Sequence, residues 1–120
     1  MKQAIAALYN QDVAGYYSLL PKEYQEYVNN PTVVFNSTYQ STGVEGSPIA
    51  KGEKLVLEYV REESEDVTWV NQIASSMGFT VAEQKNVTYK VSAESKPEVS
   101  QNIVLTFVKV KEEWYVWFWF

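Results

Sequence analysis

The sequence ends in seven consecutive residues, 114–120, that are all aromatic or β-branched. The run contains no charge, glycine or proline, so its composition favours a β-strand. Successive side chains of a strand point to opposite faces. One face would carry Trp114, Val116, Phe118 and Phe120, and the other Tyr115, Trp117 and Trp119. A strand with one face in water alternates apolar and polar residues, so this strand needs cover on both faces.

The apolar area of this strand supports that interpretation. Three large aromatic side chains carry roughly 450–750 Å², which equals or exceeds the ~300–600 Å² patch that a soluble monomer tolerates. One face can pack on helices of the same chain, and the other then needs a further element, a second subunit, a partner or a ligand. Alternatively, the strand crosses the core and its ends are simply buried. The candidate interface residues are Tyr115, Trp117 and Trp119.

Composition indicates a single globular domain, residues 1–120, that is large enough for a core. Aromatic residues make up 15% of the chain, which includes nine Tyr and four Trp. Their apolar bodies and polar tips suit pockets and interfaces, although a core built from large side chains explains most of them.

Charge and missing residue types exclude several functions. The net charge is −5 and Arg61 is the single arginine, which argues against nucleic-acid binding. The chain has no Cys and no His, so disulfides, zinc sites, thiol nucleophiles and a Ser-His-Asp triad are excluded. No run approaches the ~20 apolar residues of a membrane span. We identify no catalytic residue, metal ligand or cofactor site.

The beginning of the chain bears on its location in the cell. The apolar stretch at residues 4–8 is too short for a signal peptide. The expected first helix has no capping residue before it, which suggests that a targeting segment precedes Met1 in the natural protein. In that case we expect an extracytoplasmic or cell-envelope location, and otherwise the cytoplasm.

Helical spacing predicts helices over about residues 2–28 and 64–77. In the first region Asp12 is a good N-cap, Pro21 suits a first helical turn, and Tyr24, Tyr27 and Val28 are expected to face inward. In the second region Ser64 is the expected N-cap and Gly78 the C-terminal stop. The apolar stripe between them consists of Val67, Val70, Ile73, Ala74 and Met77.

The segment between these regions is harder to interpret. Residues 33–35 are prone to form a strand, which extends to Tyr39 in the longer interpretation, and residues 41–48 form a loop rich in glycine and proline. Residues 54–60 fit a strand or a helix. We favour a helix, because charged residues 61–63 follow without turn residues.

The sheet is expected mainly in residues 79–120. Apolar and polar residues alternate over 87–93 and 103–110, with turns at 94–98 and 111–113 before the terminal strand. These strands predict an antiparallel meander, and the whole chain predicts an α+β fold.

Two segments resemble the nuclear transport factor two-like superfamily, which is called cystatin-like in its broad form. Residues 6–21, AALYNQDVAGYYSLLP, are similar to the opening of that family, where a helix ends at an Asp break and a second helix leads into a Leu-Leu-Pro turn. Residues 105–116, LTFVKVKEEWYV, are similar to its closing hairpin. Together they cover about a quarter of the chain. The nearest likeness is to small bacterial domains of lipoproteins, cell-wall proteins and secretion machinery.

The resemblance implies N-terminal helices packed on a curved antiparallel sheet, a cone-shaped pocket between them, and dimerisation through the outer face of the sheet. Residues that could line such a pocket are aromatic: Tyr9, Tyr16, Tyr17, Trp69, Tyr89 and Phe107. Of the two roles, we favour a filled core for these side chains.

Enzymes of this superfamily, such as ketosteroid isomerases and polyketide cyclases, resemble one another in an Asp base near an oxyanion-stabilising acid. Here Asp12 is better explained as an N-cap and Asp66 by the helix dipole. Glu58, Glu83 and Glu94 lie in no catalytic motif. Asn36 and Asn86 begin glycosylation-like triplets that we interpret as ordinary loop and turn residues.

We therefore expect a non-catalytic binding or assembly domain of a bacterial envelope or surface protein, which associates with itself or with a protein partner through an apolar outer sheet face. The alternative is a pocket for a small apolar ligand, with or without isomerase-type or cyclase-type acid-base chemistry. A role as an accessory domain of a secretion apparatus or a cell-wall enzyme is a third possibility.

Overall fold

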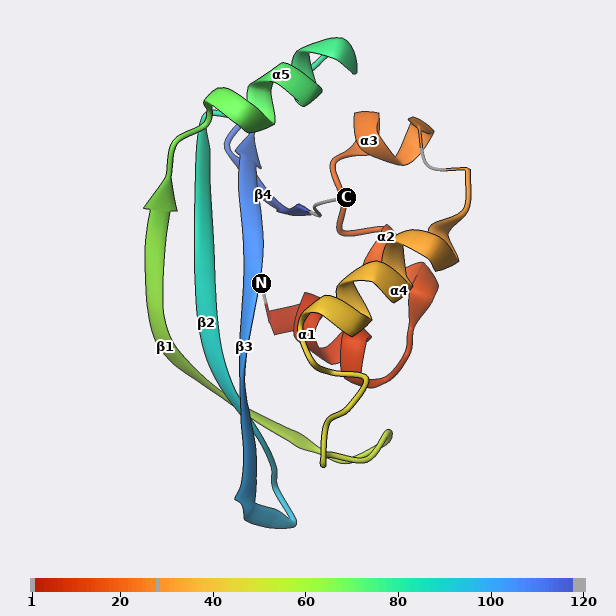
Figure 1. Ribbon diagram of the computed structural model, residues 1–120, viewed down its shortest axis with the longest axis vertical. Coiled ribbons are helices and arrows are strands. Elements are labelled where there is room, and N and C mark those ends of the chain that lie inside the picture. The colour runs from red at the N-terminus through yellow and green to blue at the C-terminus, as the bar shows by residue number, and fades with distance from the viewer. Residues whose placement is uncertain (1, 28, 118–120) are drawn as a thin grey trace.

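The computed structural model describes residues 2–27 and 29–117. Along the chain, four helices precede the first strand, a fifth follows it, and three strands end the described part (Figure 1). The elements are α1 (Lys2–Tyr9), α2 (Val13–Tyr17), α3 (Lys22–Tyr27), α4 (Pro31–Ser41), β1 (Leu55–Glu65), α5 (Thr68–Ser76), β2 (Glu83–Ala93), β3 (Lys96–Val110) and β4 (Glu113–Trp117).

The strands form one antiparallel sheet in the order β1-β2-β3-β4. Helices α1, α2 and α4 lie on one side of this sheet, and α5 lies across one of its ends (Figure 1). The predicted α+β fold, with N-terminal helices on an antiparallel sheet, is therefore confirmed. The sheet gains one strand that the sequence did not predict, namely β1.

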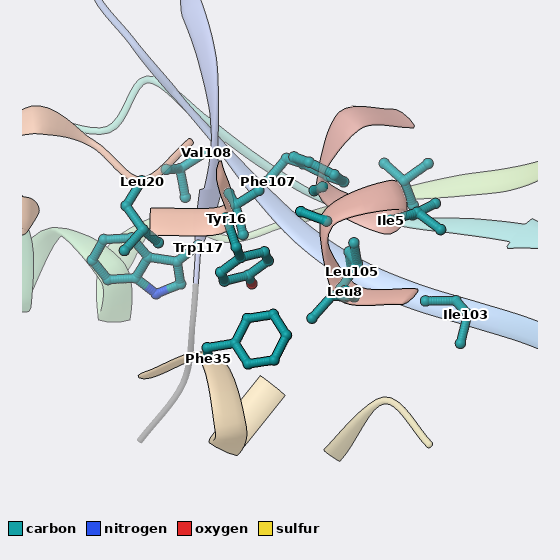
Figure 2. Close-up of a cluster of buried hydrophobic side chains, with 14 of the residues drawn as sticks. Ile5, Leu8, Tyr16, Leu20, Phe35, Ile103, Leu105, Phe107, Val108 and Trp117 are labelled. Atoms are coloured by element: carbon teal, nitrogen blue, oxygen red, sulfur yellow. The ribbon is translucent and has the colours of Figure 1, made fainter. Parts of the chain in front are cut away.

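The core lies between α1 and the inner face of the sheet. Ile5 and Leu8 of α1 are fully buried and lie near Leu105 and Phe107 of β3 (Figure 2). Alternate residues of β3 point inward, because the strand has a two-residue period. This burial contributes to the apolar contact between the helical layer and the sheet.

Both faces of β4 are covered by the chain itself. Val116 is buried on one face, opposite Phe107. Trp117, on the other face, is 3% exposed, and its ring centroid lies 5.3 Å from that of Tyr24 and 6.2 Å from that of Phe79. The N–H of Val116 donates to the carbonyl of Leu19 at 2.9 Å. Phe118, Trp119 and Phe120 lie outside the described residues.

The strand that we expected at residues 33–39 is wrong, because this segment is the helix α4. The side chain of Asn30 accepts a hydrogen bond from the N–H of Thr32 at 3.1 Å, and Pro31 follows in the first turn. Such an Asn cap followed by Pro starts a helix. Its buried face then draws on Val34, Phe35 and Thr38, at helical spacing, and this outweighs the β propensity of the two valines.

The helix that we favoured at residues 54–60 is also wrong, because these residues begin β1. Inward-facing Leu57 pairs with Val91, and the Tyr59 ring packs edge-on to that of its partner Tyr89 at 5.9 Å. The charged residues that follow continue the strand rather than a helix. They are tolerated there because β1 is an edge strand with both faces largely in water.

Smaller boundaries also differ from the prediction. Ser64 belongs to β1, and α5 begins at Thr68, whose N–H donates to Asp66 Oδ1 at 2.7 Å. Tyr27 is exposed rather than inward, and Val28 lies outside the described residues. The turn expected at 94–98 is tighter, since Ala93 already pairs with Lys96. The stop at Gly78, with φ +88°, is confirmed.

The turn between β3 and β4 places two non-glycine residues in the left-handed region, Lys111 at φ 51° and Glu112 at φ 69°. This conformation is that of a type I′ turn, which favours Asn-Gly. We expect Lys111→Asn combined with Glu112→Gly to raise the free energy of unfolding by about 1 kcal/mol, because strain is relieved at both residues. Urea denaturation measures the change. Ser95→Gly, in a turn without positive φ, is the matched control, and an equal gain there would contradict the explanation.

The N-cap of α2 makes a second prediction. Asp12 Oδ1 accepts from the N–H of Gly15 at 2.9 Å, and a Cβ added to Gly15 would lie 2.3 Å from Asp12 Oδ2. We expect Asp12→Ala to cost about 1 kcal/mol. Gly15→Ala should bring little gain in the parent chain, because the methyl group displaces the capping carboxylate. In the Asp12→Ala background it should stabilise by about 1 kcal/mol. Thermal denaturation of the four chains measures this coupling, and simple additivity would contradict it.

Candidate functional site

The aromatic residues proposed for a pocket are mostly used as core. Tyr9 and Tyr16 are buried, and their hydroxyls donate to Gln101 Oε1 at 2.6 Å and to Thr38 Oγ1 at 3.4 Å. The Tyr16 ring also meets that of Phe35 edge-on, with 5.8 Å between centroids. Phenol groups that are packed and hydrogen-bonded in this way fill the core and do not line a cavity.

The remaining members of that set do not converge on one site. Tyr89 and Phe107 are buried, Tyr17 is half-buried with its hydroxyl on the carbonyl of Gln25, and Trp69 is 72% exposed on α5. A small hollow beside Phe107 and Val116 has a volume of about 40 Å³. Ligand pockets typically measure ~300–1,000 Å³, so this hollow is too small for a drug-sized ligand.

The carboxylates do not form an acid-base pair beside these buried rings. Asp12 caps α2, as predicted, and Asp66 bonds to the start of α5. Two Tyr hydroxyls donate to carboxylates, Tyr59 to Glu62 and Tyr115 to Glu113, and both pairs are exposed. Within residues 2–27 and 29–117, no group of three or more metal-ligating side chains is placed to hold an ion.

The proposed interface residues on β4 have different environments. Trp117 is enclosed by Tyr24 and Phe79 of the same chain, whereas Tyr115 is half-buried. Trp119 lies outside the described residues. The cover that Trp117 requires therefore comes from the chain itself and not from a partner.

The outer face of the sheet is less apolar than we expected. Where it is open, it carries Val56 on β1 and Val104 on β3, which are 47% and 50% exposed. The row between them is polar, with Glu58 opposite Lys90 and Lys90 opposite Asn102. Isolated valines among polar residues are normal on a protein surface. Over the described residues, this face therefore offers no continuous apolar patch.

The most accessible feature of the sheet is the edge strand β1. Its eleven residues pair with β2 on one side, and no described element pairs with the other side. Every residue from Glu58 to Glu65 is exposed. The register shifts between Tyr59 and Arg61, so Val60 occupies a bulge without a partner on β2. Unpaired backbone N–H and C=O groups on such an edge can pair with another chain.

Most of the chain's net charge lies along this strand. Residues 58–66 hold five carboxylates and one guanidinium, against a net charge of −5 for the whole chain. Two of these carboxylates are in ion pairs, Glu62 with Lys85 at 2.6 Å and Glu63 with Arg61 at 3.5 Å. Hydrogen bonds from Lys85 and Tyr59 lower the pKa of Glu62, while the bond to Glu62 raises the pKa of Lys85. The other charged side chains of residues 58–66 are exposed to water.

A hollow lies where β1 ends, between the start of α5 and the start of β2. Its volume is about 410 Å³, and its lining includes Glu65, Asp66 and Glu83. Gln84 also lines it. This side chain is only 5% exposed, and its Oε1 atom has no hydrogen-bond partner. An orphaned buried amide oxygen costs roughly 1–3 kcal/mol. We call this hollow the acidic groove.

Sequence reasoning missed β1 and the acidic groove. The alternation of Leu55, Leu57 and Tyr59 was the available signal for a strand, but the charged run after it was interpreted as the continuation of a helix. No sequence pattern could indicate the groove, because its lining combines residues 64–68 with residues 82–84, and these two segments meet only in the folded chain.

Comparison of the chain with models of known protein families, with curated proteins and with solved structures finds no match. The resemblance to the nuclear transport factor two-like superfamily therefore stays a prediction. Among the described residues, no helix is both long enough and apolar enough to span a membrane.

The buried Tyr16 makes the core sensitive to alkaline pH. Burial raises the pKa of its hydroxyl to about 12, although the Thr38 bond opposes the shift, and burial also raises the pKa of Tyr24. Because the folded-state pKa exceeds the unfolded value near 10, no stability is lost below pH 10. Between pH 10 and 12 this residue should lower the free energy of unfolding by about 1.4 kcal/mol per pH unit.

We therefore expect Tyr16→Phe to flatten the stability curve above pH 10, measured by urea denaturation at each pH. Tyr27→Phe, which alters an exposed ring, is the matched control and should leave the slope unchanged. Parallel curves for Tyr16→Phe and the parent chain would contradict the role of this hydroxyl.

Proposed function

We propose that this protein is a non-catalytic binding domain that pairs an extended segment of a protein partner with the free edge of β1. The observation that carries this proposal is an eleven-residue edge strand, open on one side within the described residues and exposed from Glu58 to Glu65. Strand addition supplies affinity through main-chain hydrogen bonds and specificity through alternate side chains.

The two edges of the sheet differ in a way that favours β1. On β4, the N–H of Val116 is already bonded to Leu19. On β1 the apolar half, residues 55–60, combines half-buried Leu55 and Leu57 with exposed Val56 and Tyr59. A partner strand would extend the sheet beside these side chains.

The occupant that fits best is a segment of opposite charge. Two copies of the chain would bring two acidic strands together, which opposes self-association. A charged edge with a bulge is the usual protection against pairing of like edges. Neither feature excludes a partner that carries positive charge. Pairing with a second copy of the chain, which we expected from the sequence, is thus less favoured than pairing with a basic segment of another protein.

The likeness to small domains of bacterial lipoproteins and envelope proteins supports a place in a bacterial envelope or surface protein. In that setting the domain would hold a segment of a neighbouring protein rather than transform a substrate.

The edge is tested with Val60→Pro. Val60 sits in the bulge without a strand partner, so proline should spare the ladder with β2 while it blocks an incoming strand. The probes are short peptides of alternating Thr and Val, with basic, neutral or acidic ends. We expect the basic peptide to bind the parent chain, to protect amides of β1 from hydrogen exchange, and to bind Val60→Pro at least about tenfold more weakly, since lost hydrogen bonds are worth over 1 kcal/mol.

Val104→Lys is the matched control, because Val104 is equally exposed but lies on the outer face of β3. If Val104→Lys abolished binding and Val60→Pro did not, the outer face would be the binding surface and the edge proposal would fail. Sedimentation of the parent chain without peptide tests the other occupant. A dimer that Val60→Pro dissociates would replace the basic partner with a second copy.

A further inference from the structure

A hollow lies between α1 and the start of β1, on the helical side of the sheet. Its volume is about 410 Å³, and its apolar lining consists of Ala6 of α1 together with Leu55 and Leu57 of β1. The charged residues that line it are Lys2, Glu53 and Lys54. None of the described lining residues comes from β2, so the hollow adjoins the edge strand and not the middle of the sheet. We call it the edge hollow.

The two leucines of the edge hollow are apolar side chains that the chain covers incompletely. Leu55 pairs with Ala93 of β2, and Leu57 pairs with Val91. Both β2 partners are buried, whereas both leucines are only half-buried against the same core. Cover of the inner face therefore becomes incomplete at β1. A neighbour on the open side of this strand would remove more of the leucine surface from water, which is favourable.

The backbone of β1 determines how an added strand would meet these leucines. The carbonyl of Lys54 accepts a hydrogen bond from the N–H of Glu94 at 2.8 Å, so the backbone groups of Lys54 point to the β2 side. Residues of an antiparallel strand alternate between those whose backbone groups bond to one neighbour and those whose groups point away from it. The backbone groups of Leu55 and Leu57 therefore point to the open edge, where a further strand can bond to them.

A strand that bonds to Leu55 and Leu57 brings its own side chains to the edge hollow. Directly opposite residues of neighbouring strands have Cβ atoms about 4.5–5.5 Å apart and share one face of the sheet. Residues of the added strand opposite the two leucines would thus point to the helical side, on which Ala6 lines the hollow. Strand pairing at this part of the edge and occupation of the hollow follow from the same geometry.

Charge distinguishes this end of β1 from the other end. Charges of both signs lie beside the edge hollow, and one of them, Lys54, is paired with Glu94 at 3.3 Å. Residues 58–66 instead carry five carboxylates and one guanidinium. The edge hollow therefore favours an apolar side chain, while the acidic part of β1 favours basic residues farther along the same partner segment.

We propose that the edge hollow receives a large apolar side chain, of the size of leucine or phenylalanine, from the partner segment that pairs with β1. The inference rests on the proposed function, because a strand on that edge is what places a side chain opposite Leu55 and Leu57. The volume of about 410 Å³ lies within the ~300–1,000 Å³ of ordinary ligand pockets, so it accommodates an aromatic ring. The partner is thus an extended segment with an apolar end and a basic end.

The experiment compares two peptides of alternating Thr and Val that carry basic residues at one end. They differ near the other end, where one Val is replaced by Phe or by Ala. Two variants of the protein alter the hollow from opposite walls. Leu57→Thr removes an apolar wall but keeps a residue that suits a strand, and Ala6→Leu fills the hollow from α1 with a good helix former. Val56→Thr is the matched control, because Val56 is exposed on the opposite face of β1.

We expect the Phe peptide to bind the parent chain at least about tenfold more tightly than the Ala peptide, because the phenyl ring is transferred from water into the hollow. Calorimetry measures both affinities. Leu57→Thr and Ala6→Leu should each reduce this preference to about threefold or less, and Val56→Thr should leave it unchanged. A preference for Phe that survives both hollow variants, or that Val56→Thr removes, would overturn the assignment of the hollow.

The proposed function and this inference fail separately. If Val60→Pro weakens both peptides while the two hollow variants leave the preference for Phe intact, the edge function stands and the hollow assignment falls. If the hollow variants remove the preference while Val60→Pro affects neither peptide, the hollow binds an apolar side chain without strand pairing, and the edge function falls. Sedimentation of the parent chain alone tests another occupant. A dimer that Leu57→Thr dissociates would assign the hollow to a second copy and overturn the inference.

Discussion

The apolar packing of α1 on the inner face of β3 joins the helical layer to the sheet. Ile5 and Leu8 of α1 belong to the same buried cluster as Leu105 and Phe107 of β3 (Figure 2). The later part of β1 lies on the side of the sheet away from α1, α2 and α4, whereas Leu55 and Leu57 at its start line a hollow together with Ala6 of α1 (Figure 1). Because the helices cover only part of the sheet, the strand farthest from them must be soluble without their cover. The acidic sequence of β1 is a consequence of that position.

The two edges of the sheet solve the problem of unpaired backbone groups differently. β4 is closed from within the chain, by the bond between Val116 and Leu19 and by the burial of Trp117. β1 is left open and is protected by charge and by the bulge at Val60. Charge protects an edge selectively, since it repels like strands and attracts unlike ones. An edge closed by packing has no such selectivity, which is why we propose β1 and not β4 as the binding edge.

Local chemistry explains which parts of the fold the sequence predicted. The Asp12 cap, the Gly78 stop and the polar turn at Lys111 each depend on a few neighbouring residues, and each lies where it was expected. The strand at 33–35 was mispredicted because valine propensity was weighed without the Asn30 cap. β1 was mispredicted because a charged run is compatible with a strand only at a sheet edge, and position in a sheet is a property of the tertiary structure.

The same distinction applies to the candidate site. Aromatic composition indicates that large rings are present, but whether Tyr16 fills a core or lines a pocket depends on what Thr38 and Phe35 place around it. The acidic groove depends on α5 turning back so that the end of β1 meets the start of β2. One short connection therefore gathers carboxylates from the end of β1, the link to α5 and the start of β2 around one hollow, although these residues lie far apart in the sequence.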